Sequence, residues 1–233
     1  MSGKRSIFQE VSSATPGPSR PSHPAGGLID GGARGAVRAI RVWLVLLALM
    51  VGLMIAIGGM TRLTDSGLSI TEWKPIAGAL PPMNESAWQD VFEKYRQTPE
   101  YRLQNKGMSL PEFRSIYWWE WSHRQLGRLI GLVWAMGFVW FLARREIPVG
   151  WTARLALPGV LGAAQGALGW WMVASGLSGR MVDVASYRLA LHLGLAFVII
   201  GLIAWFSFQL GRPPQDLLQA RRRREAVLGR LAG

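Results

Sequence analysis

The chain has 233 residues, of which 50% are hydrophobic and 17% are charged, and its formal net charge is +12. So apolar and so uneven a composition excludes an ordinary soluble domain and indicates an integral membrane protein. The sequence contains no cysteine, which excludes disulfides, zinc–thiolate sites, thiolate-ligated iron–sulfur clusters and a catalytic thiol.

Residues 1–36 are rich in serine, proline, glycine and arginine and have no apolar core beside a cleavage site. They predict a disordered cytoplasmic tail, so the first membrane helix is expected to direct insertion. Residues 37–60 follow as an apolar stretch that is about 36 Å long as a helix, enough to cross the ~30 Å hydrocarbon layer. Arg38 and Arg41 anchor its inner end.

Residues 61–116 carry seven basic and seven acidic side chains, the balance expected of a translocated loop. Within them, residues 65–67, 74–75 and 81–82 are turn signals. Residues 85–95 and 99–106 predict short amphipathic helices that lie on the membrane surface. We therefore expect a folded periplasmic cap over the outer end of the membrane helices.

The second apolar stretch, residues 129–143, is too short to cross a membrane unaided. We expect its helix to extend upstream through the aromatic cluster at 117–121, which fits the interfacial belt. The extension places Glu120, His123, Arg124 and Arg128 at or inside the outer half of the membrane. Ionisable groups at that depth are costly, so these four are candidate functional residues.

Residues 155–177 and 189–210 predict two further spans, interrupted mainly by Gln165 and His192. The expected fold is an all-α integral membrane protein, in which an up-down four-helix bundle covers residues 37–212 and a basic cytoplasmic linker covers 213–233. Fifteen of the 26 basic residues lie in the three segments that this topology assigns to the cytoplasm. Their charge orients the protein and attracts anionic lipid, and it does not indicate nucleic-acid binding.

The spacing of the histidines favours a haem site. His123 and His192 are expected at matching depths because the second and fourth spans run in the same direction. Two imidazoles at one level on facing helices suit a haem with two axial nitrogens, and Arg124 and Arg128 supply charge for its propionates. A proton relay or simple packing would use the same histidines, and snorkelling would explain the arginines. Glu120 is compatible equally with an ion pair to Arg124 and with a catalytic role.

The chain resembles the haem A synthase family in long strings: 58–69 (GGMTRLTDSGLS), 71–75 (TEWKP), 78–82 (GALPP), 118–124 (WWEWSHR), 173–177 (VASGL) and 191–193 (LHL). The absence of cysteine resembles the alphaproteobacterial and mitochondrial branch of that family. The resemblance implies a bacterial inner-membrane enzyme that oxidises the C8 methyl group of haem O to the formyl group of haem A. It also implies that Glu120 is the essential glutamate and that His123 and His192 hold the iron of the substrate haem.

Members of that family resemble two four-helix halves related by a pseudo-twofold axis, and the resemblance covers the N-terminal half only. It implies that a resident haem b belongs to a second half, which this sequence lacks. Expected partners are haem O, haem O synthase, membrane lipid, an unknown electron donor, and a C-terminal half-bundle or a second copy. The alternatives are a bis-histidine cytochrome b for electron transfer, which leaves Glu120 without a role, and a non-catalytic haem-binding assembly protein.

Overall fold

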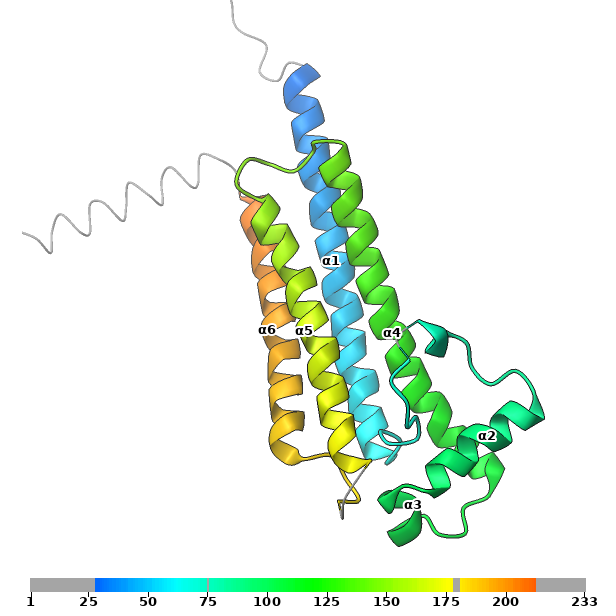
Figure 1. Ribbon diagram of the computed structural model, residues 1–233. Helices are drawn as coiled ribbons and strands as arrows, with labels where there is room; N and C mark the ends of the chain where they lie inside the picture. Colours follow the sequence, from blue (N-terminus) through cyan, green and yellow to red (C-terminus); the bar gives the residue numbers. More distant parts are fainter. Residues whose placement is uncertain (1–27, 75, 178–180, 213–233) are drawn as a thin grey trace, which may run out of the picture. The chain divides into compact units, whose positions relative to one another are not determined.

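The computed structural model describes residues 28–74, 76–177 and 181–212, whose regular structure is entirely helical. The chain divides into two compact units, residues 1–34 and 35–233, and the packing described below lies in the second. The elements are α1 (Leu28–Leu63), η2 (Ala77–Ala79), α2 (Glu85–Arg96), α3 (Pro99–Leu103), α4 (Leu110–Ala143), α5 (Thr152–Gly176) and α6 (Ser186–Gly211). Figure 1 shows α1, α4, α5 and α6 side by side.

Among the residues that the structure describes, three helices are long and apolar enough to cross a membrane: Arg34–Leu63 of α1, α4 and α6. The expectation of an all-helical integral membrane protein is confirmed by these three. The predicted third span corresponds to α5, which has 25 residues but is not among the apolar helices found in the described part of the chain. Its sequence includes five glycines and the polar Gln165.

Two of the helices extend further than the sequence predicted. Residues 28–36, expected in the disordered tail, belong to α1, because a helix that has nucleated in an apolar stretch propagates into its neighbours at little cost. The second span starts at Leu110, where the Glu112 carboxylate accepts a hydrogen bond from the Ser109 N–H at 2.7 Å. Its predicted upstream extension is therefore confirmed. The remaining tail, 1–27, and the linker, 213–233, lie outside the described residues.

The segment between α1 and α4, residues 64–109, has an aromatic core of its own, and we call it the cap. The side chain of Asn84 caps α2 and the hydroxyl of Thr98 caps α3, each by accepting a backbone N–H at the helix start. The predicted helix at 85–95 is confirmed, whereas the one at 99–106 ends at Leu103 and gives way to a turn with Gly107 at φ 93°. Six buried rings form the core, in part with α4: Trp88, Phe92, Tyr95, Tyr101, Phe113 and Tyr117.

Among the side-chain donors that bind a backbone carbonyl oxygen of a neighbouring long helix, four link the helices in sequence around the bundle, and Arg188 of α6 adds a fifth bond to the Trp171 carbonyl of α5 at 2.7 Å. The four pairs are Trp43 Nε1 with Val133 (α1 to α4, 3.0 Å), Trp134 Nε1 with Leu155 (α4 to α5, 3.1 Å), Gln165 Nε2 with His192 (α5 to α6, 2.9 Å) and Arg41 Nε with Ser207 (α1 to α6, 3.1 Å). The four bonds form a closed ring around the helices. In that ring α4 and α6 are diagonally opposed, each flanked by α1 and α5.

Glycine makes three of these bonds possible. The accepting carbonyls in α4, α5 and α6 lie four residues before Gly137, Gly159 and Gly211. A helical Cβ leans over the preceding turn, so its absence leaves that turn's carbonyl open to a second donor. A Cβ at any of the three glycines would overlap the donor side chain. These positions are therefore close helix contacts, the use that small residues commonly have in membrane proteins.

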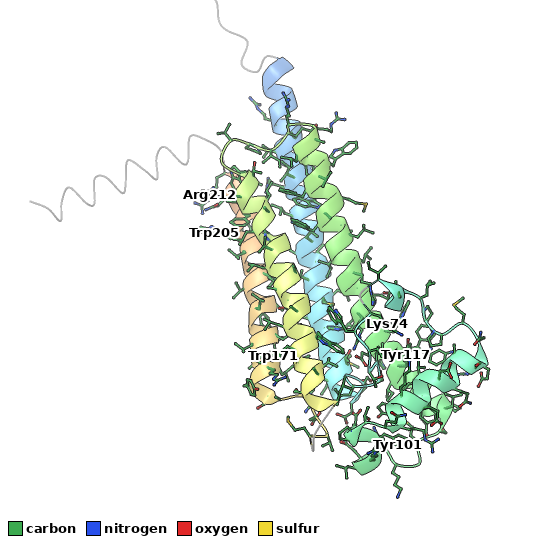
Figure 2. The ribbon with its side chains drawn as sticks, in the orientation of Figure 1. Lys74, Tyr101, Tyr117, Trp171, Trp205 and Arg212 are labelled. Carbon is green, nitrogen blue, oxygen red and sulfur yellow. The ribbon has the colours of Figure 1, made fainter. Side chains whose placement is uncertain are left out.

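Aromatic and arginine side chains gather at both ends of the long helices. The Arg188 guanidinium lies 4.2 Å from the Trp171 ring centroid near the cap, and Arg212 lies 6.0 Å from that of Trp205 at the other end (Figure 2). Tryptophan and arginine are typical of the two membrane–water interfaces. The two clusters are therefore compatible with the two ends of membrane-crossing helices.

Candidate functional site

His123 and His192 lie on the diagonally opposed helices α4 and α6, and each ring packs against a glycine of a flanking helix. The Nε2 atom of His123 is 3.0 Å from the point where a Cβ on Gly58 of α1 would stand. The Cε1 atom of His192 is 2.9 Å from the corresponding point on Gly169 of α5. Each of the two histidines that the sequence singled out therefore packs against a glycine of a different flanking helix.

This region has the features that a haem with two axial histidines would need. Because Gly58 and Gly169 have no side chain, the rings of His123 and His192 occupy space that a larger residue would fill. His192 Nδ1 and Gln165 Oε1 are both buried and have no hydrogen-bond partner among the described atoms, although the Gln165 amide already donates to the His192 carbonyl. A histidine that binds iron through one ring nitrogen usually donates its other N–H to an acceptor. The unused oxygen of Gln165 is an acceptor of that kind, so the residues present fit the group.

Glu120 lies one turn from His123 toward the cap and is 3% exposed. Its Oε2 accepts hydrogen bonds from the Ser69 hydroxyl and the Ile70 N–H, both at 2.7 Å. Its Oε1 accepts from Nε and Nη2 of Arg124 at 3.0 and 2.6 Å. The predicted ion pair between Glu120 and Arg124 is therefore confirmed, and the hydrogen bonds from Ser69 and Ile70 to Glu120 join the cap to α4.

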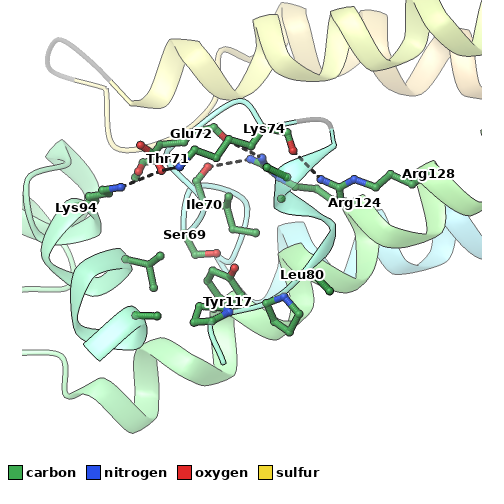
Figure 3. A pocket seen from close by; sticks show the side chains of 16 residues that line it. Ser69, Ile70, Thr71, Glu72, Lys74, Leu80, Lys94, Tyr117, Arg124 and Arg128 are labelled. Atoms are coloured by element: carbon green, nitrogen blue, oxygen red, sulfur yellow. Dashed lines mark hydrogen bonds and ion pairs between the residues drawn. The ribbon is translucent and has the colours of Figure 1, made fainter. Parts of the chain in front are cut away.

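Arg124 and Arg128 hold the backbone of the cap against α4. Arg124 donates to the carbonyls of Ile70 at 2.8 Å and Glu72 at 3.2 Å, and Arg128 donates to that of Lys74 at 3.1 Å (Figure 3). On the other side of this loop the Trp73 ring lies 5.2 Å from that of Trp170 on α5. The two arginines therefore fix a loop that runs between α4 and α5.

Three contributors to this arrangement were missed by sequence reasoning: Ser69, Ile70 and Gln125. Gln125 donates to the Ala79 carbonyl at 2.7 Å. Two of the contacts use backbone atoms, which carry no signature of residue type, and each joins positions more than 45 residues apart. The only signal was indirect, because Ser69 falls within one of the family-like strings.

A cleft of about 220 Å³ opens beside this loop, and its charged lining is mainly basic. Lys74, Lys94, Arg124 and Arg128 contribute cations, and Glu72 contributes one anion (Figure 3). Glu72 accepts hydrogen bonds from Lys74 at 2.8 Å and from Lys94 at 3.0 Å, and these bonds hold the pKa of Glu72 below its usual range. The cleft retains an excess of positive charge, which suits a carboxylate or another anion.

Fold and site define a helical integral membrane protein with an inward-facing histidine pair and a buried glutamate–arginine pair at its cap end. The family described as "Cytochrome oxidase assembly protein" matches residues 41–232, and the chain belongs to that family.

Relatives that carry the name "Heme A synthase" match nearly the whole chain. The protein of Dinoroseobacter shibae is 66% identical over 98% of this chain and 59% of its own length. The protein of Paracoccus denitrificans is 64% identical over 97% of this chain and 58% of its own length. The protein of Ruegeria pomeroyi is 61% identical over 100% of this chain and 60% of its own length. The chain thus spans less than two thirds of the length of these relatives. No solved structure matches it.

Proposed function

We propose that the chain binds haem O and takes part in the oxidation of its C8 methyl group to the formyl group of haem A. The observation that carries the proposal is the packing of His123 on α4 and His192 on α6, each beside a glycine of a flanking helix. The names of its relatives support the same function. They do not favour a cytochrome b that only transfers electrons or a haem-binding assembly protein without catalysis.

The proposed roles follow from the contacts of each residue. His123 and His192 hold the iron of the substrate haem. Gln165 orients His192 by donating a hydrogen bond from its side-chain amide to the backbone carbonyl of His192. A haem held there would supply redox chemistry at this site, and an external oxidant would accept the four electrons that leave the methyl group. Glu120 is the catalytic residue, and its Oε2 holds a proton when the Ser69 hydroxyl turns away, while Oε1 stays paired with Arg124. Arg124 and Arg128 place positive charge where propionates would lie.

We further propose that all four long helices cross the membrane as an up-down bundle. Because α4 and α6 run in the same direction in Figure 1, the chain has to return through α5, whose glycines are compatible with a buried position. The distribution of basic residues supports a periplasmic cap and cytoplasmic termini in the inner membrane. A second, pseudo-symmetric half-bundle would supply the haem b site, and haem O synthase would supply the substrate.

The test is to express the full chain in cells that make haem O, purify it from membranes, and identify the extracted haem by mass spectrometry. His123→Ala and His192→Ala should each lose most of the bound haem. His23→Ala replaces the third histidine of the sequence and serves as the matched control. Glu120→Gln keeps the shape of the side chain, and it should keep the haem while abolishing haem A and its hydroxylated precursors.

Retention of haem by the double variant His123→Ala/His192→Ala would refute the site. Haem O bound to the unsubstituted chain with no oxidised product would contradict a catalytic role for this chain alone. Co-expression with the remaining portion of a relative would then separate an incomplete enzyme, which regains haem A formation, from a carrier, which does not.

A further inference from the structure

We propose that residues 76–83 of the cap enter the lipid bilayer beside α4, so that their partner is the hydrocarbon of the cap-side leaflet. This segment, Ile-Ala-Gly-Ala-Leu-Pro-Pro-Met, contains no polar side chain. Its three large residues are among the most exposed apolar side chains of the structure: Ile76 at 87%, Leu80 at 74% and Met83 at 79%. Exposed apolar surface of this density marks a contact with a partner or a membrane.

The depth of the segment follows from counting along two helices. Helix α4 ends at Ala143, and Arg144 and Arg145 follow it. About 20 helical residues cross the hydrocarbon, and a count of about 20 residues back from Ala143 reaches Arg124. About 20 residues after Arg41, α1 reaches Thr61, which lies one turn beyond Gly58 and its contact with His123. The two counts place the cap-side edge of the hydrocarbon between positions 120 and 124 of α4.

The segment is attached to α4 at or below that edge. Gln125 binds the carbonyl of Ala79 at 2.7 Å, and Arg128 binds that of Lys74 at 3.1 Å. A Cβ on Gly78 would stand 3.2 Å from Nη2 of Arg128, so the backbone itself lies against this side chain. At 1.5 Å per residue, positions 125 and 128 lie about 2 to 12 Å inside the hydrocarbon edge.

Irregular backbone survives at membrane depth only where its polar groups are satisfied by protein, and hydrogen bonds within the protein satisfy part of the backbone of this segment. Gly78 N–H donates to the Lys74 carbonyl and Ala79 N–H to that of Ile76, both at 3.0 Å. Pro81 and Pro82 have no N–H to satisfy. The polar side chains of α4 would be costly in lipid by themselves. Because they donate hydrogen bonds to carbonyl oxygens of the loop, the polar groups of the helix and of the loop satisfy one another.

The segment also continues the apolar surface of α4. Leu129, Leu132, Met136 and Val139 are exposed, and their spacing of three and four residues places them on one stripe of the helix. Gln125 lies one turn before Leu129 on the same stripe. The loop thus covers the stripe at its polar position, Gln125. Ile76 and Leu80 extend the apolar surface of α4 toward the membrane edge.

Because the sequence contains no cysteine, single-cysteine spin labels test the proposal directly in the full chain. Ile76→Cys and Leu80→Cys are labelled with a nitroxide after reconstitution into phosphatidylcholine vesicles. Power-saturation electron paramagnetic resonance then compares the accessibility of each label to oxygen, which partitions into lipid, and to a water-soluble nickel chelate. Leu132→Cys is the lipid-facing control, and Asp90→Cys, on the exposed surface of α2, is the water-facing control.

Labels at positions 76 and 80 should show an oxygen-to-nickel ratio close to that at 132 and several-fold above that at 90. Ratios equal to that at position 90 would overturn the proposal. All four substituted side chains are exposed, so the variants should fold alike, and circular dichroism of each preparation checks that they do. The outcome does not depend on haem binding, so it is independent of the function proposed above.

Discussion

Glu100 should make the cap less stable as the pH rises. This carboxyl group is 3% exposed, and its Oε2 has no partner among the described residues. Burial raises its pKa to about 7, against a value of 4.5 for the free side chain. Since the folded pKa is the higher one, the neutral form favours folding. The stabilisation is complete below pH 4.5 and is lost as the pH rises through 7.

The size of the effect follows from the pKa difference. At about 1.4 kcal/mol per pH unit, the difference between 7 and 4.5 corresponds to about 3 kcal/mol above pH 7. Glu100→Gln removes the charge while retaining shape and an acceptor oxygen. The variant cap should therefore be more stable than the original at pH 8 by up to about 3 kcal/mol, and its advantage should shrink toward pH 4.5.

Limited trypsin digestion of the full chain in detergent measures this stability, because Lys94, Arg96 and Arg102 lie in the cap and cleavage follows its opening. Glu93→Gln, an exposed carboxylate paired with Arg96, is the control that corrects for the pH dependence of the protease. At pH 8 Glu100→Gln should be cleaved on the order of 100-fold more slowly than the original chain. An equal rate ratio at pH 6 and pH 8 would refute the assignment of a neutral, buried Glu100.

Three further substitutions test the candidate site. Ser69→Ala removes one hydrogen bond to Glu120 and should weaken the attachment of the cap by about 1 kcal/mol, seen as faster tryptic cleavage of the cap. Gly169→Val should displace the His192 ring and lower the haem content of the purified chain, measured by its Soret absorbance. Gly166→Val, where a Cβ meets nothing within 4 Å, should not. Gln165→Leu should retain haem but shift its low-spin electron paramagnetic resonance signals, since the axial imidazole loses its acceptor; unchanged signals would exclude a positioning role for Gln165.

Hydropathy was sufficient to predict the long helices, and the charges within the second span were sufficient to predict that its helix extends upstream. The ends of the helices were less accessible, because they depend on local caps such as Glu112 with Ser109 and on helix propagation into residues 28–36. The third span was predicted from a run of residues without charges, whereas the corresponding helix α5 is not among the helices of the described residues that are apolar enough to cross a membrane.

The candidate site was only partly predictable from the sequence. Helix periodicity relates Glu120 to Arg124, and matching depth relates His123 to His192. The attachment of the cap was not predictable, because its acceptors are backbone carbonyls and its donors lie about 50 residues away. Gln165 was noted as a polar interruption of a span, and only its neighbours in three dimensions show that it reaches His192.

The ring of hydrogen bonds between the long helices has a mechanical consequence for His192. The ring meets α6 at two heights, at the carbonyls of His192 and Ser207, which are 15 residues or about 22 Å apart along the helix axis. One such point would act as a pivot, whereas two points held from different neighbours, α5 and α1, prevent the helix from turning about its own axis. The direction in which the imidazole faces is therefore set partly at the far end of the membrane, by the side chain of Arg41.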